Sequence, residues 1–96
     1  MPQNPIGPRP GGSASALNLT AATVVKASPG TVYRVVVNTA GSTAGGIYDA
    51  ATTSGNTAAN LIASIEAAGV YDLTFPCTTG ILFEPGTAMV ASVSYA

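Results

Sequence analysis

The sequence predicts an all-β protein: an antiparallel β-sandwich of about seven short strands, jelly-roll-like or Greek key, with an extended Pro-rich N-terminal arm. Three observations predict this fold. Two segments in the second half of the chain alternate between apolar and polar residues, Pro-Gly turns precede Val-containing runs, and turn signals recur about every ten residues. The immunoglobulin pattern Cys…Trp…Cys is absent, because the chain has one Cys and no Trp.

The N-terminal arm spans residues 1–16 and precedes a sandwich domain of residues 17–96. Prolines at positions 2, 5, 8 and 10 exclude a helix and remove the backbone donors of a strand ladder. The arm is either a terminal tail without a role or a segment that orders along a partner, with Ile6 as an apolar anchor and Arg9 as a cation. The residues predicted to bind a partner are Asn4, Pro5, Ile6, Pro8, Arg9 and Pro10.

Three long strands follow from their side chains. Thr31–Thr39 is rich in Val and Thr, and it is expected to place Tyr33, Val35 and Val37 on one face and Val32, Arg34 and Val36 on the other. Gly69–Phe75 is expected to bury Tyr71, Leu73 and Phe75 and to expose Val70, Asp72 and Thr74. Met89–Tyr95 is expected to bury Met89, Ala91, Val93 and Tyr95.

Four shorter runs complete the sandwich. They are rich in apolar or β-branched residues and are predicted as strands at Ala22–Lys26, Gly46–Asp49, Leu61–Glu66 and Gly80–Phe83. Asn60 could instead cap a helical turn over Leu61–Glu66, but six residues are too few for a helix that is stable alone. Turns are expected at Ser28-Pro29-Gly30 and Glu84-Pro85-Gly86, where Pro precedes Gly.

The charge count excludes several classes of protein. Of 96 residues, three are basic, four are acidic and none is His, and 7% charged residues is far below the roughly 25% of an ordinary domain. A net charge of −1 argues against nucleic-acid binding, and one Cys without His argues against a zinc site. Ala supplies much of the apolar fraction, so the core is thin and oligomerisation is the expected supplement. The chain shows neither a secretion signal nor a membrane span, which predicts assembly in the cytoplasm without membrane contact.

No constellation of catalytic residues emerges. The carboxylates Asp49, Glu66, Asp72 and Glu84 are not paired by their spacing, and no base accompanies Cys77. We therefore expect no enzymatic activity, no cofactor and no metal. Tyr48 is the one Tyr without an apolar strand face, so Tyr48 and Asp49 are the candidate exposed contacts.

The chain resembles the small β-rich structural proteins of tailed-bacteriophage virions, of the head-decoration, cement or fibre type. The resemblance covers about residues 22–95, and its most distinctive pieces are Ser28-Pro29-Gly30, Gly46-Ile47-Tyr48-Asp49, Phe75-Pro76-Cys77 and Glu84-Pro85-Gly86-Thr87. It implies a non-enzymatic protein of the virion that oligomerises and attaches to a capsid.

Two functions are predicted from these observations. The first is a virion structural protein, assembled in the host cytoplasm, that forms a homo-oligomer, with a trimer favoured, and decorates or stabilises a phage capsid. Its N-terminal arm would contact the major capsid protein, another virion protein or a neighbouring subunit. The alternative is a receptor- or glycan-binding tip module of a head or tail appendage, whose site would combine the loops Gly41–Gly46 and Ala51–Ala59 with Tyr48 and Asp49.

Overall fold

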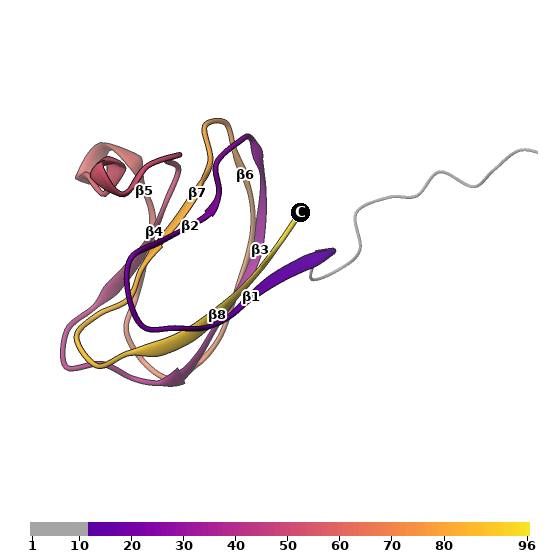
Figure 1. Ribbon diagram of the computed structural model, residues 1–96. Helices are drawn as coiled ribbons and strands as arrows, with labels where there is room; N and C mark the ends of the chain where they lie inside the picture. Colours follow the sequence, from indigo (N-terminus) through magenta and orange to yellow (C-terminus); the bar gives the residue numbers. More distant parts are fainter. Residues whose placement is uncertain (1–11) are drawn as a thin grey trace, which may run out of the picture.

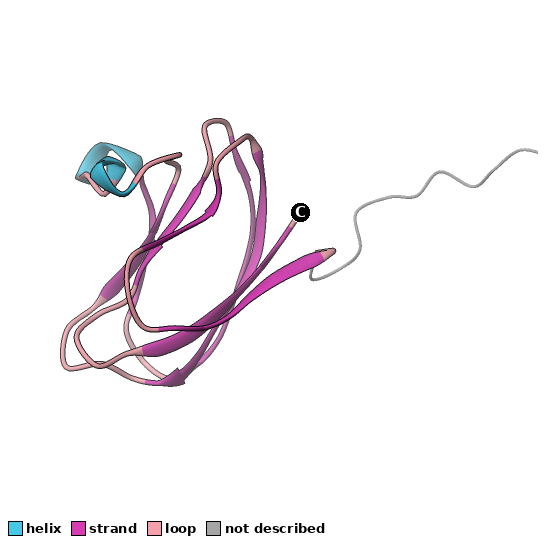
Figure 2. Cartoon of the chain, in the orientation of Figure 1, coloured by secondary structure: helices cyan, strands magenta, loops and turns pink. Residues whose placement is uncertain are grey.

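Eight strands form two four-stranded antiparallel sheets that pack face to face (Figure 1, Figure 2). The computed structural model describes residues 12–96, so the predicted partner-binding residues of the arm, from Asn4 to Pro10, lie outside the described residues. The strands are β1 (Ala14–Leu19), β2 (Thr23–Lys26), β3 (Gly30–Thr39), β4 (Gly45–Tyr48), β5 (Leu61–Ile65), β6 (Gly69–Cys77), β7 (Ile81–Glu84) and β8 (Val90–Tyr95). Two 3-10 helices, η1 (Thr53–Gly55) and η2 (Ala58–Asn60), lie between β4 and β5.

The strand order is that of a jelly roll. The first sheet, here called sheet A, has the order β1-β8-β3-β6, and the second, sheet B, has the order β2-β7-β4-β5. The first strand therefore pairs with the last, the second with the seventh, the third with the sixth and the fourth with the fifth. This is a long hairpin rolled into a double sheet, which confirms the predicted sandwich and its jelly-roll topology.

All seven predicted strands are present, and Leu61–Ile65 is a strand rather than a helical turn. The strand β1 was not predicted, because its sequence ASALNL shows no apolar alternation. It is held mainly by its ladder with β8, where Ala14 lies opposite Tyr95, and Leu19 is its one side chain that packs against the core. The boundary predicted at residue 16 is therefore wrong: the sandwich includes Ala14–Ala16.

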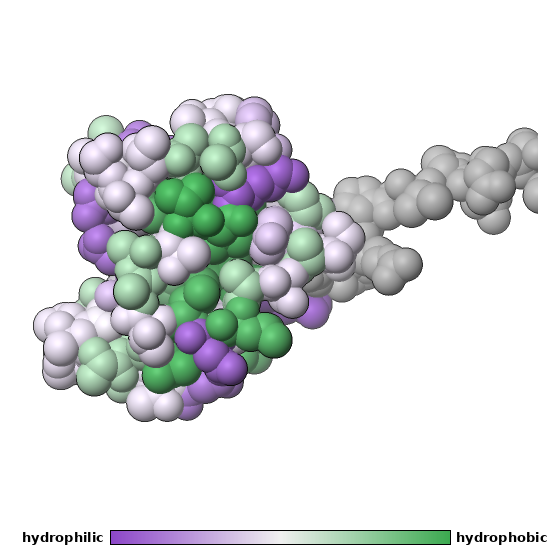
Figure 3. Space-filling model, in the orientation of Figure 1, coloured by the Kyte–Doolittle hydropathy of each residue, from purple (hydrophilic) through white to green (hydrophobic). Residues whose placement is uncertain are grey.

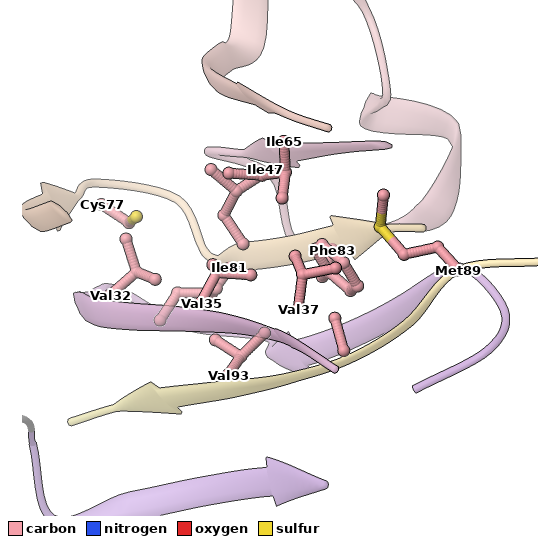
Figure 4. Close-up of a cluster of buried hydrophobic side chains, with 11 residues drawn as sticks. Val32, Val35, Val37, Ile47, Ile65, Cys77, Ile81, Phe83, Met89 and Val93 are labelled. Atoms are coloured by element: carbon pink, nitrogen blue, oxygen red, sulfur yellow. The ribbon is translucent and has the colours of Figure 1, made fainter. Parts of the chain in front are cut away.

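The core lies between the sheets and is built mainly from inward-facing residues of the inner strands β3, β4, β7 and β8, with Ile65 and Cys77 from the edge strands β5 and β6 (Figure 4). Its buried members are Val32, Val35, Val37, Ile47, Ile65, Cys77, Ile81, Phe83, Met89, Ala91 and Val93. The predicted inward face of β8 is confirmed, since Ala91 and Val93 are buried and Tyr95 packs against them. Burial of these apolar side chains is the main force that holds the two sheets together.

Two bulges change the predicted faces of the long strands. The register of β3 shifts between Val32 and Arg34, which brings Val32 into the core instead of the outer face. On β6, two residues between Asp72 and Phe75 oppose one residue of β3, and Thr74 there has a φ of 45°. Phe75 consequently stays 43% exposed and does not join the core, contrary to the prediction.

Candidate interaction surface

Asp49 joins the end of β4 to the turn that precedes β7. Its Oδ2 accepts hydrogen bonds from the backbone N–H and the hydroxyl of Thr78, each at 3.0 Å. Its Oδ1 accepts from the backbone N–H of Thr79 at 2.8 Å and of Gly80 at 3.2 Å. Both carboxylate oxygens are thus used inside the fold. Asp49 therefore stabilises this turn while remaining half-buried, and its role as an exposed contact stays a prediction.

The electrostatics of this end of the sandwich follow from the same contacts. Desolvation acts to raise the pKa of Asp49, but the hydrogen bonds from Thr79, Thr78 and Gly80 outweigh it and hold the pKa below its ordinary value. Burial, together with the negative charge of Asp49, raises the pKa of Cys77 to about 11. Cys77 is 3% exposed and stays a protonated thiol at neutral pH, so it is not a nucleophile.

The outer face of sheet B is covered by the chain itself. Leu82 alternates with the core residues Ile81 and Phe83, so it points outward, yet it is completely buried. Tyr48, which lies opposite Leu82 on the neighbouring strand β4, is half-buried and packs against Gly46. The side-chain amide of Asn56 donates a 2.7 Å hydrogen bond to the carboxylate of Glu84 at the end of β7. The segment of residues 49–60 is therefore folded back over this sheet. Tyr48 serves as part of that cover.

The two loops of the predicted glycan site are not brought together. The β3–β4 loop and the β4–β5 segment lie at opposite ends of β4, at opposite ends of the sandwich (Figure 1). The β3–β4 loop instead docks on the β7–β8 turn: Thr87 donates its backbone N–H to the Thr43 hydroxyl at 2.8 Å, and Ser42 donates to the Thr87 carbonyl at 2.9 Å. Tyr48 and Asp49 therefore do not form one site with both loops.

The outer face of sheet A has no separate covering segment within residues 12–96, although Ser92 and Ser94, on the strand beside β1, are half-buried. Arg34, Val36, Val70, Asp72, Ser92 and Ser94 alternate with core residues and form this outer face. Arg34 and Asp72 lie opposite each other and form an ion pair at 2.5 Å, while Val70 is 63% exposed. This surface is nearly neutral and is the candidate interaction surface of the protein.

A further apolar area lies along the side of the sandwich where β1 and β2 meet. Figure 3 shows hydrophobic residues in a band down the middle of this side, with hydrophilic residues at its margins. Leu17 of β1 is 67% exposed, and all four residues of β2 are half-buried. Gly12, the first described residue, lies against Tyr33 and Tyr95.

Few charges interrupt these surfaces. Residues 12–96 contain six charged side chains, of which Arg34 and Asp72 neutralise each other, Asp49 is bonded to its turn and Glu84 accepts from Asn56. Lys26 and Glu66 remain, without an ion pair or a side-chain hydrogen bond within these residues. Across the described range, no group of three or more His, Cys, Asp or Glu side chains is placed to hold a metal ion.

Comparisons with protein-family models, curated proteins and solved structures gave no match to this chain. None of the helices in residues 12–96 is long and apolar enough to cross a membrane.

Proposed function

We propose that this protein is a non-enzymatic structural component of a tailed-phage virion, which oligomerises and decorates or stabilises the capsid. The observation that carries the proposal is the neutral, uncovered outer face of sheet A. Such a surface is inexpensive to desolvate, because its charged residues Arg34 and Asp72 already form a pair. The jelly roll is also an architecture that viral capsid proteins use, although the fold alone does not determine function.

The proposed mechanism is repeated burial of neutral surface. A decoration protein contacts many identical sites on a capsid, so a modest contact energy in each copy is multiplied by symmetry. The N-terminal arm would add a second contact to the major capsid protein or to a neighbouring subunit. Its prolines restrict the free chain and so reduce the entropy that is lost when it binds.

The test of this function is capsid binding by the full chain and by a variant that lacks residues 1–11. This truncation leaves Gly12 against Tyr95 and preserves the β1 ladder, which a deletion through residue 16 would remove. We expect the full chain to co-sediment with capsids of its phage and the truncated chain to fold but bind at least about tenfold more weakly. Absence of the full chain from purified virions, together with no binding to capsids, would refute the proposal.

The oligomeric state is tested separately by the native mass of the purified protein. A trimer is the favoured state, as expected from the thin core and the low charge. A protein that is monomeric both in solution and on capsids would remove oligomerisation from the proposal.

A further inference from the structure

The strand β6 has a free backbone edge. Among residues 12–96, it is the last strand of sheet A and pairs on one side only, with β3. A strand in this position presents unpaired N–H and C=O groups to any other strand that approaches. Six of its nine residues are exposed, and it carries Val70 and Phe75, two of the four large hydrophobic residues that are markedly exposed in residues 12–96.

The other three sheet edges are less suited to pairing. On β1 the backbone is interrupted at Asn18, the fifth of its six residues, which has a φ of 52°. The strand β2 has four residues, includes a register shift and ends at Lys26, and lysine is a residue that protects an edge. The strand β5 has five residues, and its one exposed hydrophobic residue, Leu61, is the first of them.

The two halves of β6 differ. In the second half, Thr74 lies in the bulge and Pro76 has no backbone N–H, and both features oppose pairing. The first half, Gly69–Leu73, carries no lysine or arginine, and its one charge, Asp72, is neutralised by Arg34. The segment that is free to pair is therefore short and electrically neutral, and its one positive φ, 140°, is at its first residue, Gly69.

We propose that β6 pairs antiparallel with β6 of a second copy about a two-fold axis at Val70, so that Gly69–Tyr71 lies opposite the same three residues and Ala67–Ala68 extends the contact. On the outer face, Val70 lies opposite Val36 of β3. The proposed pairing would place the Val70 side chains of the two copies next to each other, with a Val36 side chain on either side, in one apolar row of four valines. A contact about a two-fold axis joins two identical patches, which makes self-complementarity the requirement.

The neighbouring positions meet this requirement. Tyr71 would lie opposite Gly69 of the second copy, where the space beside the glycine is open, since a Cβ placed there meets nothing within 4 Å. Asp72 would lie opposite Ala68 of the second copy, so the two aspartates would not face each other. Two sheets of four strands would join into one sheet of eight.

The proline-rich arm fits this edge less well than a second copy does. Prolines at positions 2, 5, 8 and 10 cannot donate to a ladder, whereas Gly69–Leu73 contains no proline. The contact is small beside a standard interface of about 1,600 Å². We therefore expect it to be weak between free molecules and to strengthen where an assembly holds copies close together.

This inference goes beyond the proposed function and does not require a capsid. A two-fold contact cannot build a trimer, so in a trimeric protein it would join two trimers. The wild-type mass should accordingly rise with concentration to twice that of the unpaired particle, whether that particle is one subunit or three.

The first experiment is sedimentation equilibrium of the full chain up to about 1 mM, with two variants. Val70→Lys changes a residue that is 63% exposed, so the fold tolerates it, and it should weaken pairing at least about tenfold. Leu17→Lys is the matched control, because Leu17 is 67% exposed on the other edge strand of sheet A, and it should pair like the wild type. A wild type whose mass does not rise, or equal weakening by both variants, overturns the proposal.

The second experiment fixes the register. Residues that are directly opposed across an antiparallel pair have Cβ atoms about 5 Å apart, close to the distance that a disulfide needs. Val70→Cys should therefore form a disulfide-linked dimer under mild oxidation, whereas the wild type should not, because its Cys77 is buried. A Leu17→Cys variant that cross-links as fast as Val70→Cys would show random collision and overturn the register. Capsid binding is measured on the wild-type chain, in a separate assay from its self-association, so a failure of this pairing is distinguished from a failure of the proposed function.

Discussion

Replacing Asp49 by Asn tests whether the hydrogen bonds of this carboxylate contribute substantially to the stability of the sandwich. The carboxylate accepts four hydrogen bonds, three of them from backbone N–H groups. Bonds to a charged acceptor contribute about 1.5–3 kcal/mol each, but Asp49 is partly open to solvent and the four bonds are not additive. Asn keeps one acceptor oxygen and turns an NH₂ group toward backbone donors. We expect a loss of about 2 kcal/mol of unfolding free energy, seen as a midpoint lower by about 1 M in urea.

The matched control is Asp72→Asn, which makes the same chemical change at a carboxylate that is 70% exposed and paired with Arg34. A surface pair of this kind is worth less than about 1 kcal/mol, so the control should move the midpoint by less than half as much. If Asp49→Asn is no less stable than Asp72→Asn at pH 7, the Asp49 carboxylate does not stabilise the fold, and the reasoning from its hydrogen bonds is wrong.

The pH dependence provides an independent check of the same argument. The folded pKa of Asp49 lies below its unfolded value of about 3.9, so the charged form stabilises the native state. That stability is fully present above the unfolded pKa and is lost as the pH falls through the folded pKa. The difference in unfolding free energy between the wild type and Asp49→Asn should therefore be constant from about pH 5 to 7 and shrink in more acidic solution. A difference that grows toward acid would contradict this assignment.

Three further predictions concern single sites. Cys77, whose pKa is raised to about 11, should react with a thiol reagent at pH 8 at least about a hundredfold more slowly in the native protein than after denaturation, and similar rates would show that it is accessible. Gly86→Ala should destabilise the fold by about 3 kcal/mol in urea titrations, because a Cβ there would lie 1.8 Å from the Thr43 carbonyl oxygen, and a change below about 1 kcal/mol would mean that the two loops separate easily. Ser94→Ala should leave the melting temperature unchanged or higher, since its Oγ is buried without a hydrogen-bond partner, and a clear loss would reveal a partner such as water.

The strands that the sequence predicts are those whose side chains carry the period of a buried face. In β8, Ala91 and Val93 point into the core as their alternation requires. The strand β1 lacks this signal because its neighbours supply its hydrogen bonds and little of its surface is buried. A ladder between residues about eighty positions apart depends on the topology, so local sequence does not reveal it.

The bulges are hidden from the sequence for a related reason. Nothing in the run TVYRVVVNT indicates that Val32 and Val35, three residues apart, point to the same core. The extra residue on β6 and the positive φ of Thr74 result from fitting two long strands around a twisted sandwich. The alternation of side chains between the two faces of a strand therefore predicts burial correctly on each side of a bulge, but not from one side of the bulge to the other.

The role of Asp49 becomes predictable once the pairing of β4 with β7 is known. Tyr48 lies opposite Leu82, so the next residue of β4 must lie beside the turn at residues 78–80. The sequence shows an Asp after one short strand and a Thr-Thr-Gly turn before another, but these segments are about thirty positions apart. Their contact is a consequence of the jelly-roll order, which local sequence does not reveal, so the hydrogen bonds of Asp49 to residues 78–80 were not predicted.

The low charge of the chain has different consequences for the two sheets. On sheet B, it lets the chain bury its own outer face, since Leu82 and Tyr48 can be covered by the segment of residues 49–60 without leaving a buried charge unpaired. On sheet A, the outer face is also nearly neutral, but it faces outward. It carries one ion pair, between Arg34 and Asp72, and the valines Val36 and Val70, which lead to the free edge of β6. A monomer gains nothing from keeping this edge free of lysine, because lysine there would reduce unwanted pairing at little cost. The strand β6 lacks that protection, whereas β2, an edge strand of the other sheet, ends at Lys26, and this is the asymmetry that a protein built to pair along one edge would have.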